Sequence, residues 1–155
     1  MNFNFRIFFL VLFGLSQMAC IGPQHNLKKQ TISGLEGQIT ELIGNAMPSK
    51  GKASSKGLPL TTKIYIYAPL YTEQLENQNG LFCTKINGVP LDSVVSDKLG
   101  YYHIVMKPGK YSIVVGYENG FFVPYFSGLN GVAYFNIEPH KTALLNITVN
   151  QKASY

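Results

Sequence analysis

The stretch from Ser96 to Tyr117 constrains the fold of this chain more than any other. It contains two runs rich in β-branched and aromatic residues, 101–106 and 110–117, separated by Lys107-Pro108-Gly109. Proline fixes φ and glycine supplies positive φ, so this spacing predicts a β-hairpin. Side chains alternate with period two along a strand. We therefore expect one face of each run to build the core: Tyr102, Ile104 and Met106 from the first, and Tyr111, Ile113 and Val115 from the second.

The composition favours one small all-β domain. The chain has 155 residues, of which 46% are hydrophobic and 14% charged, so it has enough apolar material for a core. Ten Tyr, ten Phe, fifteen Gly and eight Pro favour strands and turns over helices. The formal charge of +5 is modest and no nucleic-acid recognition motif is present, so we expect no nucleic-acid partner.

The N-terminus predicts export. A short basic start is followed by the apolar run 7–15, which is too short to span a bilayer as a mature helix. Cys20 comes directly after a small residue, and this arrangement resembles a bacterial lipoprotein signal, although Gln17 and Met18 depart from the usual pattern. The resemblance implies a cleaved signal peptide over residues 1–19 and a lipid on Cys20. A soluble secreted protein in which Cys20 is accidental stays open as the alternative.

A lipid on Cys20 would determine where the protein resides. Several acyl chains hold a protein stably to a membrane, because each buried CH₂ contributes about 0.8 kcal/mol. Residues 20–33 would then be the lipidated cysteine and a flexible tether. No Asp follows Cys20 directly, and by resemblance to lipoprotein sorting signals this argues against retention in the inner membrane. We expect a lipid-anchored location at the outer membrane, facing the periplasm.

Four motifs, in order along the chain, resemble the carboxypeptidase regulatory-like, or transthyretin-like, β-sandwich family. They are a first strand from Ser33 that ends in a Gly44-Asn45 turn before Met47-Pro48, then Asp97-Lys98-Leu99-Gly100-Tyr101-Tyr102, Lys107-Pro108-Gly109-Lys110-Tyr111-Ser112-Ile113, and Leu144-Leu145-Asn146-Ile147-Thr148-Val149. The resemblance implies a single antiparallel β-sandwich of seven to eight strands over residues 34–150, followed by a C-terminal tail, 151–155. An enzymatic branch of the group ends in Tyr-Arg-Gly-Ser, and the last five residues here do not match it.

Two further strand predictions come from residue type and turn chemistry. Residues 62–67 are apolar on both faces and are expected in the centre of a sheet. Asn87-Gly88, between the runs 82–86 and 91–96, predicts a second hairpin.

Three segments complete the chain. Residues 71–79 are polar and form either a short helix or a loop. Residues 120–126 form either an edge strand or an irregular loop, because Pro124 cannot donate to a ladder. The runs 132–137 and 143–149 are expected to finish the sheets.

Two clusters are candidates for binding. One group of aromatic residues either covers the open end of the sandwich or forms a stacking surface for a sugar, a peptide or a partner protein: Tyr117, Phe121, Phe122, Tyr125 and Phe126. The lysines of a Gly/Ser/Lys-rich loop are either solvated or contact an anion or a lipid headgroup: Lys50, Lys52 and Lys56, with Lys63 as a further candidate. Cys83 has no cysteine partner if Cys20 is lipidated, and is expected to be a small apolar group shielded in a strand.

No catalytic constellation can be assembled from the sequence. The three histidines, at positions 25, 103 and 140, lack metal-ligand spacing, and Gly-x-Ser-x-Gly, phosphate-loop and HExxH motifs are absent from the sequence. We therefore expect a non-catalytic cell-envelope lipoprotein, a binding or structural module with no cofactor and no metal. Two alternatives stay open: a carbohydrate-binding module that uses the aromatic surface around 117–126, and an accessory subunit of an outer-membrane complex.

Overall fold

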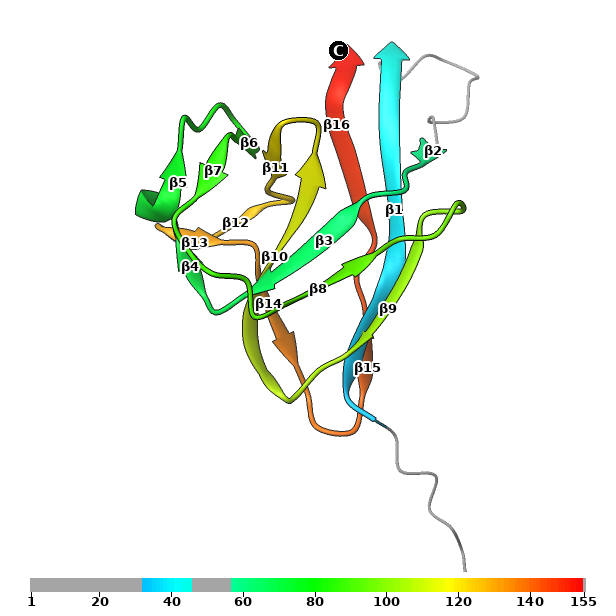
Figure 1. Cartoon of the computed structure of the whole chain (residues 1–155), viewed down its shortest axis with the longest axis vertical. Helices are drawn as coiled ribbons and strands as arrows, with labels where there is room; N and C mark the ends of the chain where they lie inside the picture. Colours follow the sequence, from blue (N-terminus) through cyan, green and yellow to red (C-terminus); the bar gives the residue numbers. More distant parts are fainter. Residues whose placement is uncertain (1–31, 46–56, 155) are drawn as a thin grey trace, which may run out of the picture.

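The structure is a computed structural model that describes residues 32–45 and 57–154 (Figure 1). The described chain is built from β-strands, with one short 3-10 turn, η1 (Thr72–Gln74). The all-β class expected from the composition is confirmed. The described part contains no helix long and apolar enough to cross a membrane.

The first sheet is organised around β1 (Gly34–Asn45). On one edge β1 pairs antiparallel with β9 (Tyr101–Val105) and β2 (Leu58–Pro59). On the other edge it pairs in parallel with β15 (Thr142–Leu144) and β16 (Ile147–Ser154). Parallel strands need a long crossover connection, and here the whole domain lies between the two strands in sequence. The expectation of purely antiparallel pairing is therefore wrong at this edge.

The second large sheet is entirely antiparallel. Its order is β6-β11-β10-β3-β8, and β14 also pairs with β10. Its strands are β3 (Lys63–Tyr67), β6 (Phe82–Cys83), β8 (Asp92–Val95), β10 (Gly109–Tyr117), β11 (Gly120–Phe122) and β14 (Tyr134–Ile137). The inner position expected for residues 62–67 is confirmed, because β3 lies between β10 and β8.

Two small sheets complete the described structure. One has the order β12-β13-β4, made of β12 (Phe126–Ser127), β13 (Gly131–Val132) and β4 (Leu70–Tyr71). The other pairs β5 (Leu75–Glu76) with β7 (Lys85–Ile86). The sixteen strand segments of residues 32–45 and 57–154 exceed the seven or eight expected, because several are only two residues long.

The main core lies between the two large sheets. One cluster of buried side chains combines Leu35, Ile39, Tyr102, Ile104, Ile147 and Val149 from the first sheet with Ile64, Ile66, Ile113, Val115, Phe122 and Ile137 from the second. Five of the six side chains predicted to build the core are buried, and Tyr111 is half-buried. The alternation along 101–106 and 110–117 therefore identified the inward faces correctly.

The hairpin predicted across Lys107-Pro108-Gly109 is wrong. β9 pairs with β1, whereas β10 pairs with β3, β11 and β14, so this turn carries the chain from one sheet to the other. The backbone N–H of Met106 donates to the Ser33 carbonyl, 3.0 Å away, instead of to β10. The inward side chains of β9 and β10 pack in the same cluster across the core, but the backbone hydrogen bonds of each strand go to other strands.

The hairpin predicted at Asn87-Gly88 is also wrong. The strand before the turn, β7, pairs with β5, and the strand after it, β8, pairs with β3. The Asn87 N–H donates to the Gln74 carbonyl at 2.7 Å, and the Leu91 N–H donates to the Ile66 carbonyl at 2.7 Å. Contacts to distant strands thus override the local turn signal.

The other predicted segments have mixed outcomes. For residues 71–79 we expected either a short helix or a loop, and the structure has the single 3-10 turn η1 followed by the short strand β5. β11 is an inner strand, between β10 and β6, and Pro124 falls in the loop after it. The predicted tail at 151–155 is wrong, because β16 continues to Ser154. The turn expected at Gly44-Asn45 is wrong, because both residues belong to β1 and pair with Ala153 and Ser154 of β16, although Gly44 does have a positive φ of 79°.

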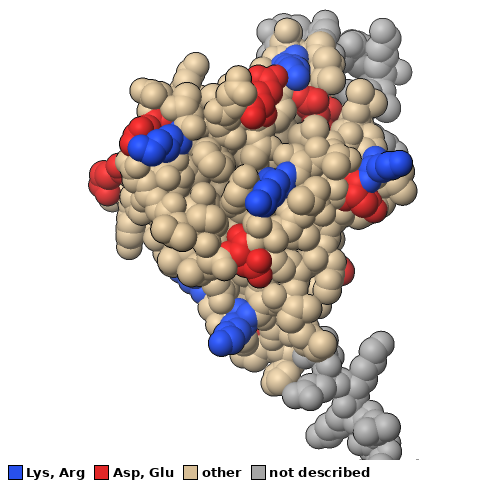
Figure 2. Space-filling view, in the orientation of Figure 1, with Lys and Arg blue, Asp and Glu red and all other residues tan. Residues whose placement is uncertain are grey.

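Charged side chains are spread over the surface. In the face shown in Figure 2, basic and acidic side chains are interspersed and most of the surface is uncharged. Ion pairs at the surface join Lys85 to Glu76 at 2.9 Å and Lys141 to Glu138 at 2.5 Å. On this face, then, positive charge is not gathered into one patch.

Candidate functional site

The turn from Asp97 to Gly100 determines how β9 begins. One carboxylate oxygen of Asp97 accepts hydrogen bonds from the backbone N–H groups of Leu99 and Tyr101, both at 2.8 Å. Gly100 has φ +80°, and a Cβ there would overlap the carbonyl oxygen of Ile39. The Gly100 carbonyl also accepts the Ile39 N–H at 2.8 Å. The turn therefore fixes β9 against β1.

Tyr102 then crosses over β1 inside the molecule. Its hydroxyl donates to the carbonyl oxygen of Leu145 at 2.6 Å, in the break between β15 and β16. The ring can pass because its partner on β1, Gly37, has no side chain. Burial raises the pKa of the Tyr102 hydroxyl, so the group stays a neutral donor. Since Tyr102 points inward, its neighbours Tyr101 and His103 must point outward.

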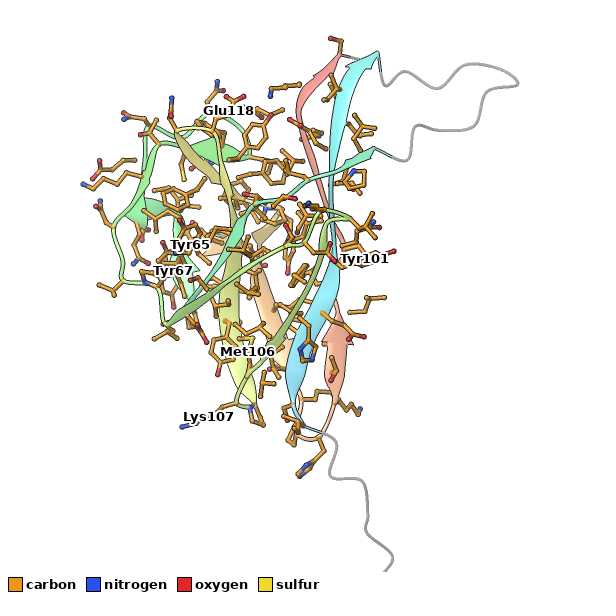
Figure 3. All side chains as sticks on the ribbon, turned by 45° about the vertical axis from the view of Figure 1, so that its right-hand side comes forward. Tyr65, Tyr67, Tyr101, Met106, Lys107 and Glu118 are labelled. Carbon is orange, nitrogen blue, oxygen red and sulfur yellow. The ribbon has the colours of Figure 1, made fainter. Side chains whose placement is uncertain are left out.

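The outward side chains of this sheet form three cross-strand rows. The register places Val105, Gly34 and Thr142 in the first row and His103, Glu36 and Leu144 in the second. In the third row Tyr101 lies opposite Gln38, whose backbone N–H donates to the Asn146 side chain at 2.9 Å. Figure 3 shows Tyr101 on the outer side of the sheet, pointing away from the rest of the molecule. We call this surface the outer face.

A shallow hollow of about 470 Å³ lies between the second and third rows of the outer face. The Gln38 side chain leaves this space free, because its amide donates to the Leu99 carbonyl at 2.9 Å in the turn before β9. The hollow is lined by Glu36, Gly37, Asp97, Tyr101, Tyr102, His103, Leu144 and Asn146. It thus combines apolar surface with several polar groups, as small-molecule sites do.

The polar groups of the hollow are only partly used by the fold. Within the described residues, neither the Glu36 carboxylate nor the His103 imidazole has a hydrogen-bond or ion-pair partner, although the two residues lie directly opposite each other. Asp97 uses one carboxylate oxygen in the turn, and Asn146 uses its amide oxygen for Gln38. The hollow therefore presents free acceptors and donors beside exposed apolar surface.

A second cluster of polar side chains lies where the core ends. Glu41 occupies an inward position of β1, in phase with Leu35 and Ile39, and is only 9% exposed. Its carboxylate accepts a hydrogen bond from the hydroxyl of Tyr117 on β10. The ammonium of Lys152 on β16 lies 3.4 Å from the Glu41 carboxylate and 3.0 Å from that of Glu118. The cluster links both sheets and accounts for the one buried acidic side chain among the described residues.

Lys152 is expected to stabilise the fold in a pH-dependent way. Its contacts with Glu118, Tyr117 and Glu41 raise its pKa above the ordinary value of 10.5. A raised pKa in the folded state means that this contribution is complete below pH 10.5 and fades as the pH rises further. Lys152→Met should therefore lower the free energy of unfolding at neutral pH, and urea unfolding at increasing pH should show the gap to wild type narrowing.

The matched control is Lys85→Met. Lys85 pairs with Glu76 at 2.9 Å, but both side chains are exposed, so the effect should be small. Equal losses in the two variants, or a gap for Lys152→Met that widens with pH, would contradict the role given to the buried carboxylate.

The predicted aromatic surface is wrong for two of its five members. Tyr117 and Phe122 are 6% and 1% exposed and belong to the core, because β10 and β11 are inner strands. Phe121 and Tyr125 are half-buried, with Phe121 edge-on to Tyr65 at 5.4 Å between ring centroids. Phe126 is 36% exposed. These five side chains do not form one continuous exposed platform.

The other predicted positions are placed as follows. Cys20, Lys50, Lys52 and Lys56 lie outside the described residues. Lys63 lies on β3, with its ammonium 5.1 Å from the centroid of the Tyr65 ring. Cys83 is fully buried in β6, and burial raises the pKa of its thiol to about 11, so the prediction of a shielded apolar group is confirmed. Within residues 32–45 and 57–154, no group of three or more His, Cys, Asp or Glu side chains is arranged to hold a metal ion.

The structure reveals residues that sequence reasoning did not single out. The alternation along 101–105 already places Tyr101 and His103 on one face, but Glu36 and Leu144 join them only through the pairing of β1 with β9 and β15. Glu41 could have been noticed as a charge in phase with Leu35 and Ile39. Comparison of the sequence with known family models and with curated proteins finds no match.

Proposed function

We propose that this protein is a non-catalytic, lipid-anchored module of the cell envelope that binds another envelope component through the outer face. The observation that carries the binding role is the hollow, with free polar groups beside exposed Tyr101 and Leu144, which are 54% and 66% exposed. Large exposed apolar side chains that gather at one place mark interaction sites. The anchor rests on the leader and Cys20, and the resulting location is the outer membrane, facing the periplasm.

We propose further that the domain is a β-sandwich of the carboxypeptidase regulatory-like kind. Two large sheets around a shared core are consistent with that architecture. The contacts of the motif residues would explain why the motif contains these residue types. Asp97 and Gly100 fix the start of β9, and Tyr102 fills the space above Gly37. Pro108-Gly109 carries the chain between the sheets.

A second role, as an accessory subunit of an outer-membrane complex, is favoured by exposed aliphatic side chains in loops away from the hollow. The strongly exposed aliphatic side chains in loops include Val89 at 86%, Leu91 at 61% and Leu129 at 99%. Such side chains gain from burial against a partner. The test compares the proteins that co-purify with the membrane-bound chain and with its Val89→Ser/Leu129→Ser variant. A partner that is lost only in this variant supports the subunit role, and a partner that the variant retains contradicts it.

The anchor is tested by mass spectrometry of the mature protein. We expect an N-terminal Cys20 that carries acyl chains, and a Cys20→Ser chain that leaves the membrane fraction. Cys83→Ala is the matched control and should remain at the membrane, because Cys83 is buried in β6. Thiol titration should find one thiol per chain, reactive only after denaturation. An unacylated Cys20, or two reactive thiols, would contradict the anchor.

A further inference from the structure

We propose that the hollow on the outer face is a binding site for a neutral saccharide. This inference rests on the proposed role as a binding module, and does not depend on the anchor. It places saccharide binding on a different surface from the aromatic segment 117–126.

The apolar part of the hollow fits one face of a sugar ring. Tyr101 and Leu144 are more than half exposed, and they lie on β9 and β15, the two strands that flank β1. A sugar ring has a face of C–H groups that packs on aromatic and aliphatic surface while its hydroxyls stay at the rim. Tyrosine suits this contact because its ring is rigid and amphipathic.

The polar groups of the hollow are of the kinds that bind hydroxyls. The Glu36 carboxylate accepts hydrogen bonds, and the His103 imidazole can both donate and accept. Neither has a partner within the described residues. Asn146 keeps its amide N–H₂ group free, because only its oxygen is bound to Gln38. A saccharide hydroxyl is both donor and acceptor, so it can bind each of these groups.

The charge of the hollow selects against acidic ligands. Its lining contains the carboxylates of Glu36 and Asp97 and, among the described residues, no Lys or Arg. An anionic sugar, a phosphate or an acidic peptide would meet repulsion there. The hollow is open to solvent, so a sugar unit bound there can belong to a longer saccharide chain.

The test is calorimetric titration, together with saturation-transfer NMR, of the full chain in a detergent without a sugar headgroup. The probes are maltotriose, cellotriose and triacetylchitotriose, each at millimolar concentrations. We expect at least one to bind, and Tyr101→Ala to weaken its affinity by about tenfold or more. Tyr101→Phe should retain binding, because the ring is kept. Val105→Ala is the matched control and should leave the affinity unchanged, because Val105 is equally exposed on the same face but lies outside the hollow.

Three results would overturn the proposal. One is no binding of any of the three trisaccharides by a folded chain. Another is binding that Tyr101→Ala does not change. The third is binding of spermidine but not of the saccharides, with loss of spermidine binding in Glu36→Gln, which would identify an amine site. Each of these can occur while Cys20 is acylated, so failure here is distinct from failure of the anchor.

Discussion

Ile113→Ala should lower the free energy of unfolding by about 2–5 kcal/mol. Ile113 is fully buried at the centre of β10, which pairs with three other strands. Its side chain packs in the cluster that joins the two large sheets. Removing three carbon atoms there loses the transfer free energy of burial and leaves a cavity, because strands held on both edges cannot close in. Urea unfolding followed by circular dichroism measures the change.

Val105→Ala provides the comparison for this core variant. Val105 is also a β-branched residue in a strand, but it is 55% exposed on the outer face. Its replacement should change the unfolding free energy by less than about 1 kcal/mol. The half-buried Tyr111 should give an intermediate loss in Tyr111→Ala. A loss in Val105→Ala as large as that in Ile113→Ala would mean that the inward and outward faces of these strands are assigned wrongly.

Gly37→Ala should be the second strongly destabilising change, with a loss of about 3 kcal/mol or more. A Cβ at position 37 would overlap the Leu145 carbonyl oxygen and press on the Tyr102 ring. The Leu145 carbonyl is held by the Tyr102 hydroxyl, so it has little freedom to move. Accommodating the methyl group requires β1 to separate from the β15–β16 break. The same urea experiment measures the loss.

Gly80→Ala separates the steric effect from a general cost of replacing glycine. Gly80 has φ +60°, but a Cβ there would have no neighbour within 4 Å, so only backbone strain of about 1 kcal/mol is expected. The double variant Gly37→Ala/Tyr102→Leu should remain destabilised, because the clash with the Leu145 carbonyl persists. Full recovery in that double variant would place the conflict at the ring alone.

The faces of the strands could be predicted from the sequence, whereas their partners could not. Alternation along 101–106 correctly points Tyr102 and Ile104 inward. The turn signals at Pro108-Gly109 and Asn87-Gly88 are local, and they report that the chain changes direction without reporting whether strand edges or strand faces meet. The pairing of Ile39 with Ile147 joins residues over a hundred positions apart, and no local pattern encodes it.

The candidate site was predicted even less completely, for the same reason. The aromatic residues around Phe122 are one candidate surface in the sequence, but the inner position of β11 places that ring in the core. The hollow combines residues from β1, β9, the turn before β9, the end of β15 and the break between β15 and β16. Its members are separated in sequence by most of the domain, so the site exists only once the strands are paired.

The parallel pairing of β1 with β15 and β16 has a mechanical consequence. The register runs from Gly34 with Thr142 to Asn45 with Ser154 through two consecutive ladders, so the start of β1 and the end of β16 lie at opposite ends of this edge (Figure 1). Tension between those two points loads both ladders in shear. Their inter-strand hydrogen bonds then share the load and do not break one after another. Forced unfolding is governed by the unfolding rate, and we expect loading in shear to keep that rate low. A domain built in this way can bear a pull between a fixed base and a load at its far end.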